Sequence, residues 1–128
     1  YLSGPALVRD HLVHTGQELD PATIDTRASS GDAACEATLQ RYEERLGQAL
    51  AGVINILDPD VIVLGGGLAN LSRLYRNLPA RCGSHAVQAP GAWRLVRGTR
   101  RCMVVGLMAK SRDHGKHLPF HRHGRSAA

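Results

Sequence analysis

The chain has 128 residues, of which 43% are hydrophobic and 4% aromatic, and its formal net charge is +5. This length suits one domain with its own core, and apolar runs such as Val61 to Leu64 fall far short of the ~20 residues of a membrane span. There is no signal-peptide pattern, and Cys35, Cys82 and Cys102 are too widely spaced for a disulfide framework or a zinc ribbon. We therefore expect a protein of the reducing cytoplasm with no membrane partner. Because the chain starts with Tyr1 and not Met, we also expect a piece of a longer protein.

The charge is divided unevenly along the chain. Residues 1–91 carry seven Lys or Arg against ten Asp or Glu, a balance of −3, whereas residues 92–128 carry nine against one, a balance of +8. We predict a globular part over 1–91 and a basic, disordered or out-of-frame tail over 92–128. Such a tail can bind nucleic acid or a membrane surface, but a solvated tail without a partner fits the same composition.

Two kinds of residue in this tail are candidates for binding. Arginines that could contact phosphates stand at positions 94, 97, 100 and 101. Few aromatic residues are available for stacking, so we expect no nucleic-acid partner. Histidines with spacings that could hold a divalent ion stand at 114, 117, 121 and 123. A nearby carboxylate is found only at Asp113, so we expect adventitious binding and assign no metal site.

The first predicted helix begins within Ser3 to Leu7, where Pro5 suits the first turn, and ends at Thr15-Gly16. Its apolar side consists of Leu7, Val8, His11 and Leu12. The pair Asp20-Pro21 then predicts a short second helix over residues 22–28.

The clearest helical pattern follows. Apolar residues recur three and four positions apart from Leu39 to Leu57, which predicts one long amphipathic helix from Asp32 to Leu57 with Asp32 as its cap. Its polar side is expected to face solvent, and it includes Arg41, Glu43, Glu44 and Arg45.

A buried strand is predicted next. Asp58-Pro59-Asp60 ends the long helix, and Val61 to Leu64 is a continuous apolar run that is typical of a strand buried on both faces. Gly65-Gly66-Gly67 ends the strand, and a further helix is expected over about Ser72 to Cys82. This order predicts an α/β protein with a parallel sheet, to which Arg94 to Val96 and Cys102 to Val105 could add strands.

The glycine turn is the chemically suggestive feature. Consecutive glycines at the carboxyl end of a buried strand let a ligand approach the backbone, whose N–H groups can bind phosphate or ribose oxygens. Gly65-Gly66-Gly67 matches neither a dinucleotide-binding nor a Walker pattern. A tight turn without a ligand therefore remains an equal alternative at this stage.

A family resemblance favours the ligand-binding alternative. The run from Asn55 to Gly67 resembles the late nucleotide-side motif of ROK sugar kinases, and Ser3 to Leu7, Gly31 to Ala34 and Arg41 to Leu46 follow the order expected in that family. The continuation from Leu68 to Tyr75 is most similar to the fructokinase or manno(fructo)kinase branch. The resemblance covers about residues 1–90.

The resemblance implies the carboxyl-terminal lobe of an actin- and hexokinase-like (ribonuclease H-like) ATPase fold, in incomplete form. It also implies phosphoryl transfer from ATP, with Mg²⁺, to a hexose hydroxyl, with fructose favoured and a homodimer expected at full length. Within this chain the implied nucleotide-binding residues are Gly65, Gly66 and Gly67, on the adenosine side of the cleft.

Other functional parts of the family are expected upstream of this chain. They include the catalytic aspartate, the phosphate loop and a zinc site with a histidine and a C-x-C-G-x-x-G-C cluster, so we assign no catalytic residue and no metal ligand here. Asp32, Asp58 and Asp60 are interpreted as cap and turn residues, and Cys35 as a small buried one. The family's closing helix is not recognisable after Pro90, which motivates the hypothesis of a shifted reading frame.

Two alternatives remain open from the sequence. The family also contains sugar-responsive transcriptional repressors that carry their DNA-binding domain upstream, so the chain could be the carboxyl-terminal part of one. The +8 tail could instead act as an anchor to nucleic acid or to a membrane, in which case binding would depend on salt.

Overall fold

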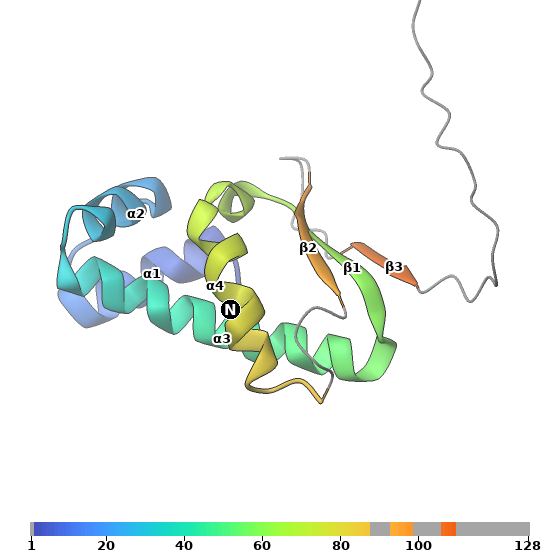
Figure 1. Cartoon of the computed structure of the whole chain (residues 1–128). Coiled ribbons are helices and arrows are strands. Elements are labelled where there is room, and N and C mark those ends of the chain that lie inside the picture. The colour runs from blue at the N-terminus through green and yellow to red at the C-terminus, as the bar shows by residue number, and fades with distance from the viewer. Residues whose placement is uncertain (1, 88–92, 99–105, 110–128) are drawn as a thin grey trace, which may run out of the picture.

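The computed structural model describes residues 2–87, 93–98 and 106–109. In chain order the elements are α1 (Gly4–Thr15), α2 (Pro21–Ser29), α3 (Ala33–Leu57), β1 (Pro59–Leu64), the 3-10 helix η1 (Gly67–Asn70), α4 (Ser72–Gly83), β2 (Arg94–Arg97) and β3 (Gly106–Ala109). Helices α1 and α2 lie at one end of the molecule and the strands at the other (Figure 1). No helix among the described residues is long and apolar enough to cross a membrane.

The predicted helices form, and local signals set their ends. Asp32 caps α3 by accepting hydrogen bonds from the backbone N–H groups of Ala34 at 3.0 Å and Cys35 at 3.1 Å. Asp20 caps α2 in the same way. Gly16 ends α1 in the left-handed conformation, at φ 72°, and its N–H bonds the carbonyl of Leu12. These caps satisfy backbone groups that a helix end leaves without partners.

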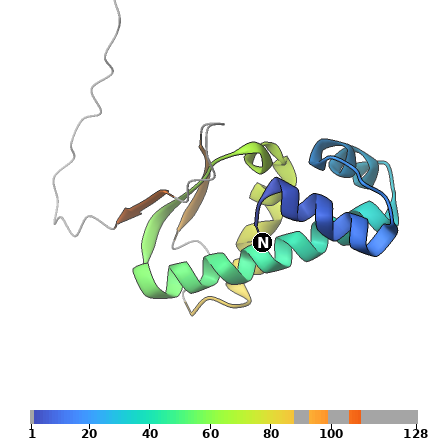
Figure 2. The ribbon, with the colours of Figure 1, turned by 180° about the vertical axis from the view of Figure 1, so that it is seen from behind.

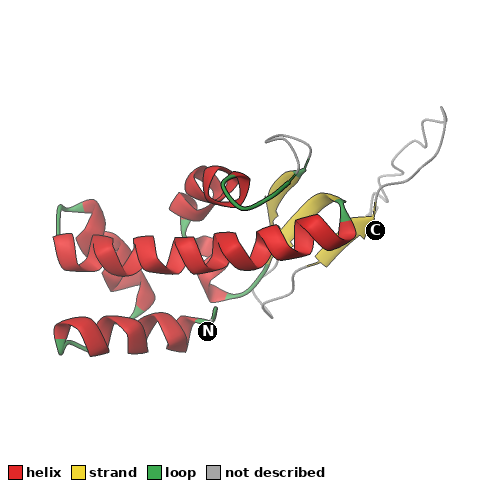
Figure 3. Cartoon of the chain, turned by 90° about the horizontal axis from the view of Figure 1, so that it is seen from below, coloured by secondary structure: helices red, strands yellow, loops and turns green. Residues whose placement is uncertain are grey.

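Helix α3 is the long central helix of the fold, and it runs from the helical end to the sheet (Figure 3). Helices α1 and α4 lie on different sides of it (Figures 1 and 2). Its buried apolar side consists of Cys35, Leu39, Tyr42, Leu46, Leu50, Ala51 and Ile54. The apolar side predicted for α1 needs one correction, because Leu12 is 39% exposed while Leu7 and His11 are buried.

The described strands form a sheet in the order β2-β1-β3. Strands β1 and β2 are parallel, with Leu64 paired to Arg97, and this part of the sheet agrees with the prediction. Strand β3 is antiparallel to β1, so the sheet is mixed and the prediction of a parallel sheet was wrong for this edge. The strand expected at Arg94 to Val96 is confirmed, whereas the one expected at Cys102 to Val105 lies outside the described residues.

Candidate functional site

The glycine turn follows β1, the middle strand of the described sheet. Gly66 has φ 86° and ψ −177°, a backbone conformation that is essentially restricted to glycine. Gly67 begins η1, is exposed, and a Cβ atom added there would meet nothing within 4 Å. The turn therefore combines one position that needs glycine with one where the backbone lies open to an approaching molecule.

Hydrogen bonds within the turn fix its shape. The N–H of Ala69 donates to the carbonyl of Gly66 at 3.2 Å, and the side-chain amide of Asn70 donates to the carbonyl of Gly67 at the same distance. The hydroxyl of Tyr75, on α4, donates to the carbonyl of Ala69 at 2.9 Å. The carbonyl groups of Gly66, Gly67 and Ala69 thus accept hydrogen bonds from other groups of the protein.

Strand β2 brings two further residues beside the turn. The N–H of Gly98 donates to the carbonyl of Leu64 at 2.6 Å, directly before Gly65. The guanidinium of Arg97 lies over the Tyr75 ring, 5.3 Å from the ring centroid. From the sequence, Arg97 was expected in the tail, as a candidate for contacts with nucleic-acid phosphates. A strand followed by glycine at Arg97-Gly98, as at Leu64-Gly65, is the signal that could have located it at the same sheet edge.

A partly buried ion cluster holds α4 against α3. Arg73 donates from Nε to Glu43 at 2.5 Å and from both terminal nitrogens to Glu36 at 2.8 and 2.9 Å. Asn77 donates to both carboxylate oxygens of Glu43 at 3.0 Å. Glu43 is 1% exposed, so the prediction that it faces solvent was wrong, because α4 supplies its partners.

This cluster also favours ionised side chains. The hydrogen bonds from Arg73, against the opposing effect of burial, lower the pKa of Glu36 to about 2. The two carboxylates in turn raise the pKa of Arg73. Because Arg73 stands just after η1, the cluster fixes the end of the glycine turn relative to α3.

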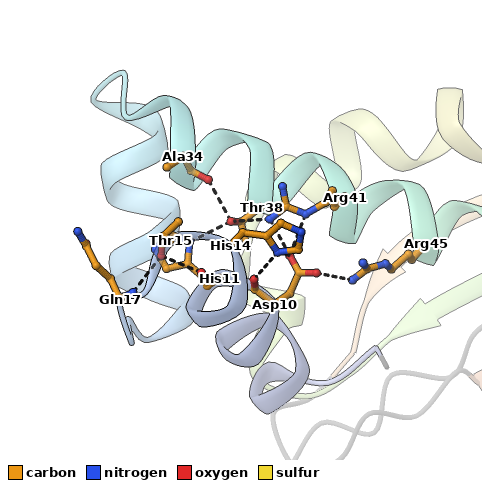
Figure 4. A network of polar contacts seen from close by, with 9 residues as sticks. All are labelled: Asp10, His11, His14, Thr15, Gln17, Ala34, Thr38, Arg41 and Arg45. Carbon is orange, nitrogen blue, oxygen red and sulfur yellow. Dashed lines mark hydrogen bonds and ion pairs between the residues drawn. The ribbon is translucent and has the colours of Figure 1, made fainter.

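A second network joins α1 to α3 (Figure 4). Asp10 accepts hydrogen bonds from Arg41 at 2.8 and 2.9 Å and from Arg45 at 2.8 Å. Burial opposes ionisation of this carboxyl, but the two arginines outweigh it and lower the pKa of Asp10. A hollow beside Asp10 and Arg45 faces solvent with Arg9 and His14 on its wall. Because Asp10 lies on α1 and both arginines lie on α3, the network holds these two helices together.

The buried histidine of α1 belongs to the same region (Figure 4). Nδ1 of His11 lies 2.9 Å from the hydroxyl of Thr38, and that hydroxyl donates to the carbonyl of Ala34 at 3.0 Å. His11 thus links two helices and faces no open surface.

Among the described residues, the acids and cysteines singled out in the sequence do not gather at the turn, while Cys102 lies outside the described residues. Asp32 is a helix cap, as predicted, and Asp58 ends α3 with φ 46°, whereas Asp60 lies within β1 and is not a turn residue. Cys35 is buried in α3, as predicted, and Cys82 is buried in α4.

The described part of the chain contains no cluster of metal-ligating side chains. No group of three or more His, Cys, Asp or Glu side chains there could hold a metal ion, so it offers no fit for zinc. The tail histidines at positions 114, 117, 121 and 123 lie outside the described residues.

Comparisons with known proteins agree with this architecture. A sequence profile of the ROK family matches residues 1–99. The chain is 33% identical over 97 residues to the N-acetyl-D-glucosamine kinase of Photobacterium profundum and 31% identical over 97 residues to that of Aliivibrio salmonicida, and each match covers 76% of this chain and 32% of the relative. Among solved structures it is similar to the ROK hexokinase from Thermus thermophilus, with a TM-score of 0.63 and 27% identity, covering 74% of this chain and 32% of that chain.

The chain therefore belongs to the ROK family, as the sequence predicted. The likeness to the Thermus hexokinase confirms the predicted fold class, an incomplete lobe of the actin- and hexokinase-like fold. The chain spans 32% of the length of the curated relatives it matches. Both of these relatives are named as N-acetyl-D-glucosamine kinases, so they lend no support to the predicted fructokinase branch.

Proposed function

We propose that this chain is part of an ATP-dependent hexose kinase and that Gly65, Gly66 and Gly67 lie against the adenosine side of the bound nucleotide. One observation carries the proposal. The turn at the carboxyl end of the middle strand β1 keeps Gly66 in a glycine-only conformation and leaves Gly67 without a neighbour on its open side. Ligands of open α/β sheets bind at this edge, outside the carboxyl ends of parallel strands.

The proposed reaction is phosphoryl transfer. The bond between the γ-phosphorus and the β–γ bridging oxygen of ATP breaks, a bond from that phosphorus to a sugar hydroxyl oxygen forms, and an aspartate upstream of this chain takes the hydroxyl proton. Mg²⁺ neutralises phosphate charge when it is bound, and we assign none of the described residues to it. The described residues contribute by positioning the nucleotide, and the chain alone is expected to be inactive.

The sugar is proposed from two different indications. The names of the relatives favour N-acetyl-D-glucosamine. The run from Leu68 to Tyr75 resembles the fructokinase branch, so fructose stays a prediction. Assaying the complete gene product with ATP and each of the two sugars decides between them, because the preferred substrate has the higher kcat/KM. A product active on neither sugar contradicts both assignments.

Three further predictions are carried forward as proposals. The proposed division between a globular part over 1–91 and a distinct tail over 92–128 has to accommodate β2, which lies in the sheet, and the family match, which reaches residue 99. A frame change found near codon 91 of the gene would support the division, while an intact frame would contradict the shifted-frame hypothesis. The repressor alternative would gain support from a helix-turn-helix encoded upstream of Tyr1. A homodimer is expected for the full-length protein and is checked by its mass in solution.

Nucleotide binding is tested on the full 128-residue chain by calorimetry with Mg-ATP. A Gly67→Glu variant places a bulky side chain in open space at the turn, where it would cover the backbone that is proposed to face the adenosine, without straining that backbone. Gly52→Glu is the matched control, because a Cβ at Gly52, in α3, also meets nothing within 4 Å. We expect Mg-ATP binding that Gly67→Glu loses and Gly52→Glu keeps. Binding that survives in Gly67→Glu, or no binding by the unaltered folded chain, would contradict the proposal.

A further inference from the structure

Two side chains beside the glycine turn form a cation–π contact that the proposed function leaves unused. We define Tyr75 and Arg97 as the stacking platform. The guanidinium of Arg97 lies 5.3 Å from the centroid of the Tyr75 ring, a distance at which a cation is attracted to a ring face. Arg97 is exposed and Tyr75 is half-buried, so the guanidinium lies on the outer side of the pair.

The platform is attached on both sides of the turn. The hydroxyl of Tyr75 is fixed at 2.9 Å to the carbonyl of Ala69 in η1, after the glycines. Arg97 is paired in register with Leu64, and the N–H of the next residue, Gly98, donates to the Leu64 carbonyl at 2.6 Å, before the glycines. An exposed arginine is normally mobile, whereas this one is positioned by its strand and by a fixed ring.

We propose that Arg97 is a nucleotide-binding residue that stacks the purine base of ATP on the guanidinium face turned away from Tyr75. This inference rests on the proposed function and names a further residue of the same site. A guanidinium is flat and weakly hydrated, so it can lie between two rings, which the ammonium group of lysine cannot do.

The base is favoured over the phosphates for a geometric reason. Cζ of Arg97 already lies over the Tyr75 ring, and a flat ring that stacks on the exposed side of the guanidinium would leave this contact in place. A phosphate would instead need the N–H edges of the guanidinium. The adenosine side of the nucleotide is also the part that the proposed function places at the neighbouring glycines.

The test is calorimetry of the full chain with Mg-ATP and, separately, with adenosine. The variants are Arg97→Lys, which keeps the charge but loses the flat group, and Arg97→Gln, which loses the charge and replaces the guanidinium with a smaller amide. Arg94→Gln is the matched control, because Arg94 is an exposed arginine of the same strand, paired at its other end with Val61. Circular dichroism melting checks that every variant is folded.

We expect both Arg97 variants to bind Mg-ATP and adenosine about tenfold more weakly, by the same factor for each ligand, with Arg94→Gln unchanged. Wild-type affinity in Arg97→Lys, or a loss confined to Mg-ATP, would overturn the stacking proposal in favour of a phosphate contact. Unchanged binding in both variants would overturn it while leaving the proposed function intact. If the unaltered chain binds neither ligand, the proposed function fails, and this inference fails with it.

Discussion

The helical end of the chain and the edge of its sheet use polar groups in opposite ways. Around α1 and α3, side chains carry the chemistry: Asp10 binds two arginines, and His11 binds Thr38 (Figure 4). At the carboxyl edge of β1, the polar groups that matter belong to the backbone of a glycine turn. At the helical end, the side chains of Asp10 and His11 already have partners within the protein. At the glycine turn, the backbone of Gly67 is exposed.

This difference indicates that the glycine turn, and not the charged cluster, is the better candidate for a ligand site. In the charged cluster the Asp10 carboxylate is engaged by two arginines and ties α1 to α3, and Arg9 and Arg45 lie on the wall of the hollow beside it. A turn whose carbonyls are held from the protein side and whose glycine backbone is uncovered has capacity for a ligand. We therefore expect substitutions in the clusters to change stability, and substitutions at Gly67 or Arg97 to change nucleotide binding.

The largest effect is expected at the cluster between α3 and α4. Arg73→Ala removes the charged partner of Glu43, which is 1% exposed and would keep only Asn77. Leaving a buried carboxylate without its partner ion costs about 3–5 kcal/mol of the free energy of unfolding. Urea denaturation measures this cost. Arg76→Ala, at an exposed position of the same helix, is the control and should change it by less than about 0.5 kcal/mol. Equal changes in the free energy of unfolding for the two substitutions would show that the cluster does not stabilise the packing of α4 against α3.

The next prediction is that alanine at two neighbouring glycines of the turn lowers the stability by different amounts. Gly66→Ala forces a side chain into φ 86° and ψ −177°, which costs about 1–3 kcal/mol, whereas Gly67→Ala meets open space and should be nearly neutral. Thermal melting of both variants gives the comparison. If both melt at the wild-type temperature, Gly66 does not need its glycine-only conformation.

An effect of similar size is expected from the buried hydroxyl of α3. Thr38→Val keeps the shape of the side chain but leaves Nδ1 of His11 without its partner, at a cost of about 1–3 kcal/mol. Thr26→Val in α2 is the matched control, since the hydroxyl of Thr26 bonds the carbonyl of Ala22 in the same way but is exposed. Urea denaturation of both variants should show a loss at Thr38 that exceeds the loss at Thr26. The reverse order would contradict the structural role assigned to His11.

The smallest effect is a dependence of stability on pH. The pKa of Glu36 falls from its usual 4.5 to about 2 in the folded chain, so its contribution is complete above pH 4.5 and is lost as the pH falls toward 2. The Glu36 side chain is 37% exposed, so solvent screening limits this contribution to less than about 1 kcal/mol. Urea denaturation between pH 6 and pH 2.5 should show a shallower loss of stability in Glu36→Gln than in the wild type. Identical slopes would rule out the Glu36–Arg73 pair as a source of acid sensitivity.

Features that depend on local signals could be predicted from the sequence. The cap at Asp32, the end of α1 at Gly16 and the strand before the glycines each follow from a few neighbouring residues. Membership of the ROK family followed from a continuous run, Asn55 to Gly67.

Features that depend on distant partners could not be predicted. Burial of Glu43 depends on Arg73, which is 30 residues away, and α3 alone gives no sign of it. The platform at Tyr75 and Arg97 requires knowing that β2 pairs in parallel with β1. The antiparallel β3 likewise follows from sheet pairing that the strand pattern does not specify.

The most direct test of the central claim, that the glycine turn and not the charged helical region meets the nucleotide, is a titration of the ¹⁵N-labelled chain with Mg-ATP followed by amide NMR shifts. We predict shifts at Gly65 to Asn70 and at Arg97-Gly98, with the amides of α1 unchanged. Shifts centred on the amides around Asp10 and Arg45, with the turn unmoved, would contradict the account.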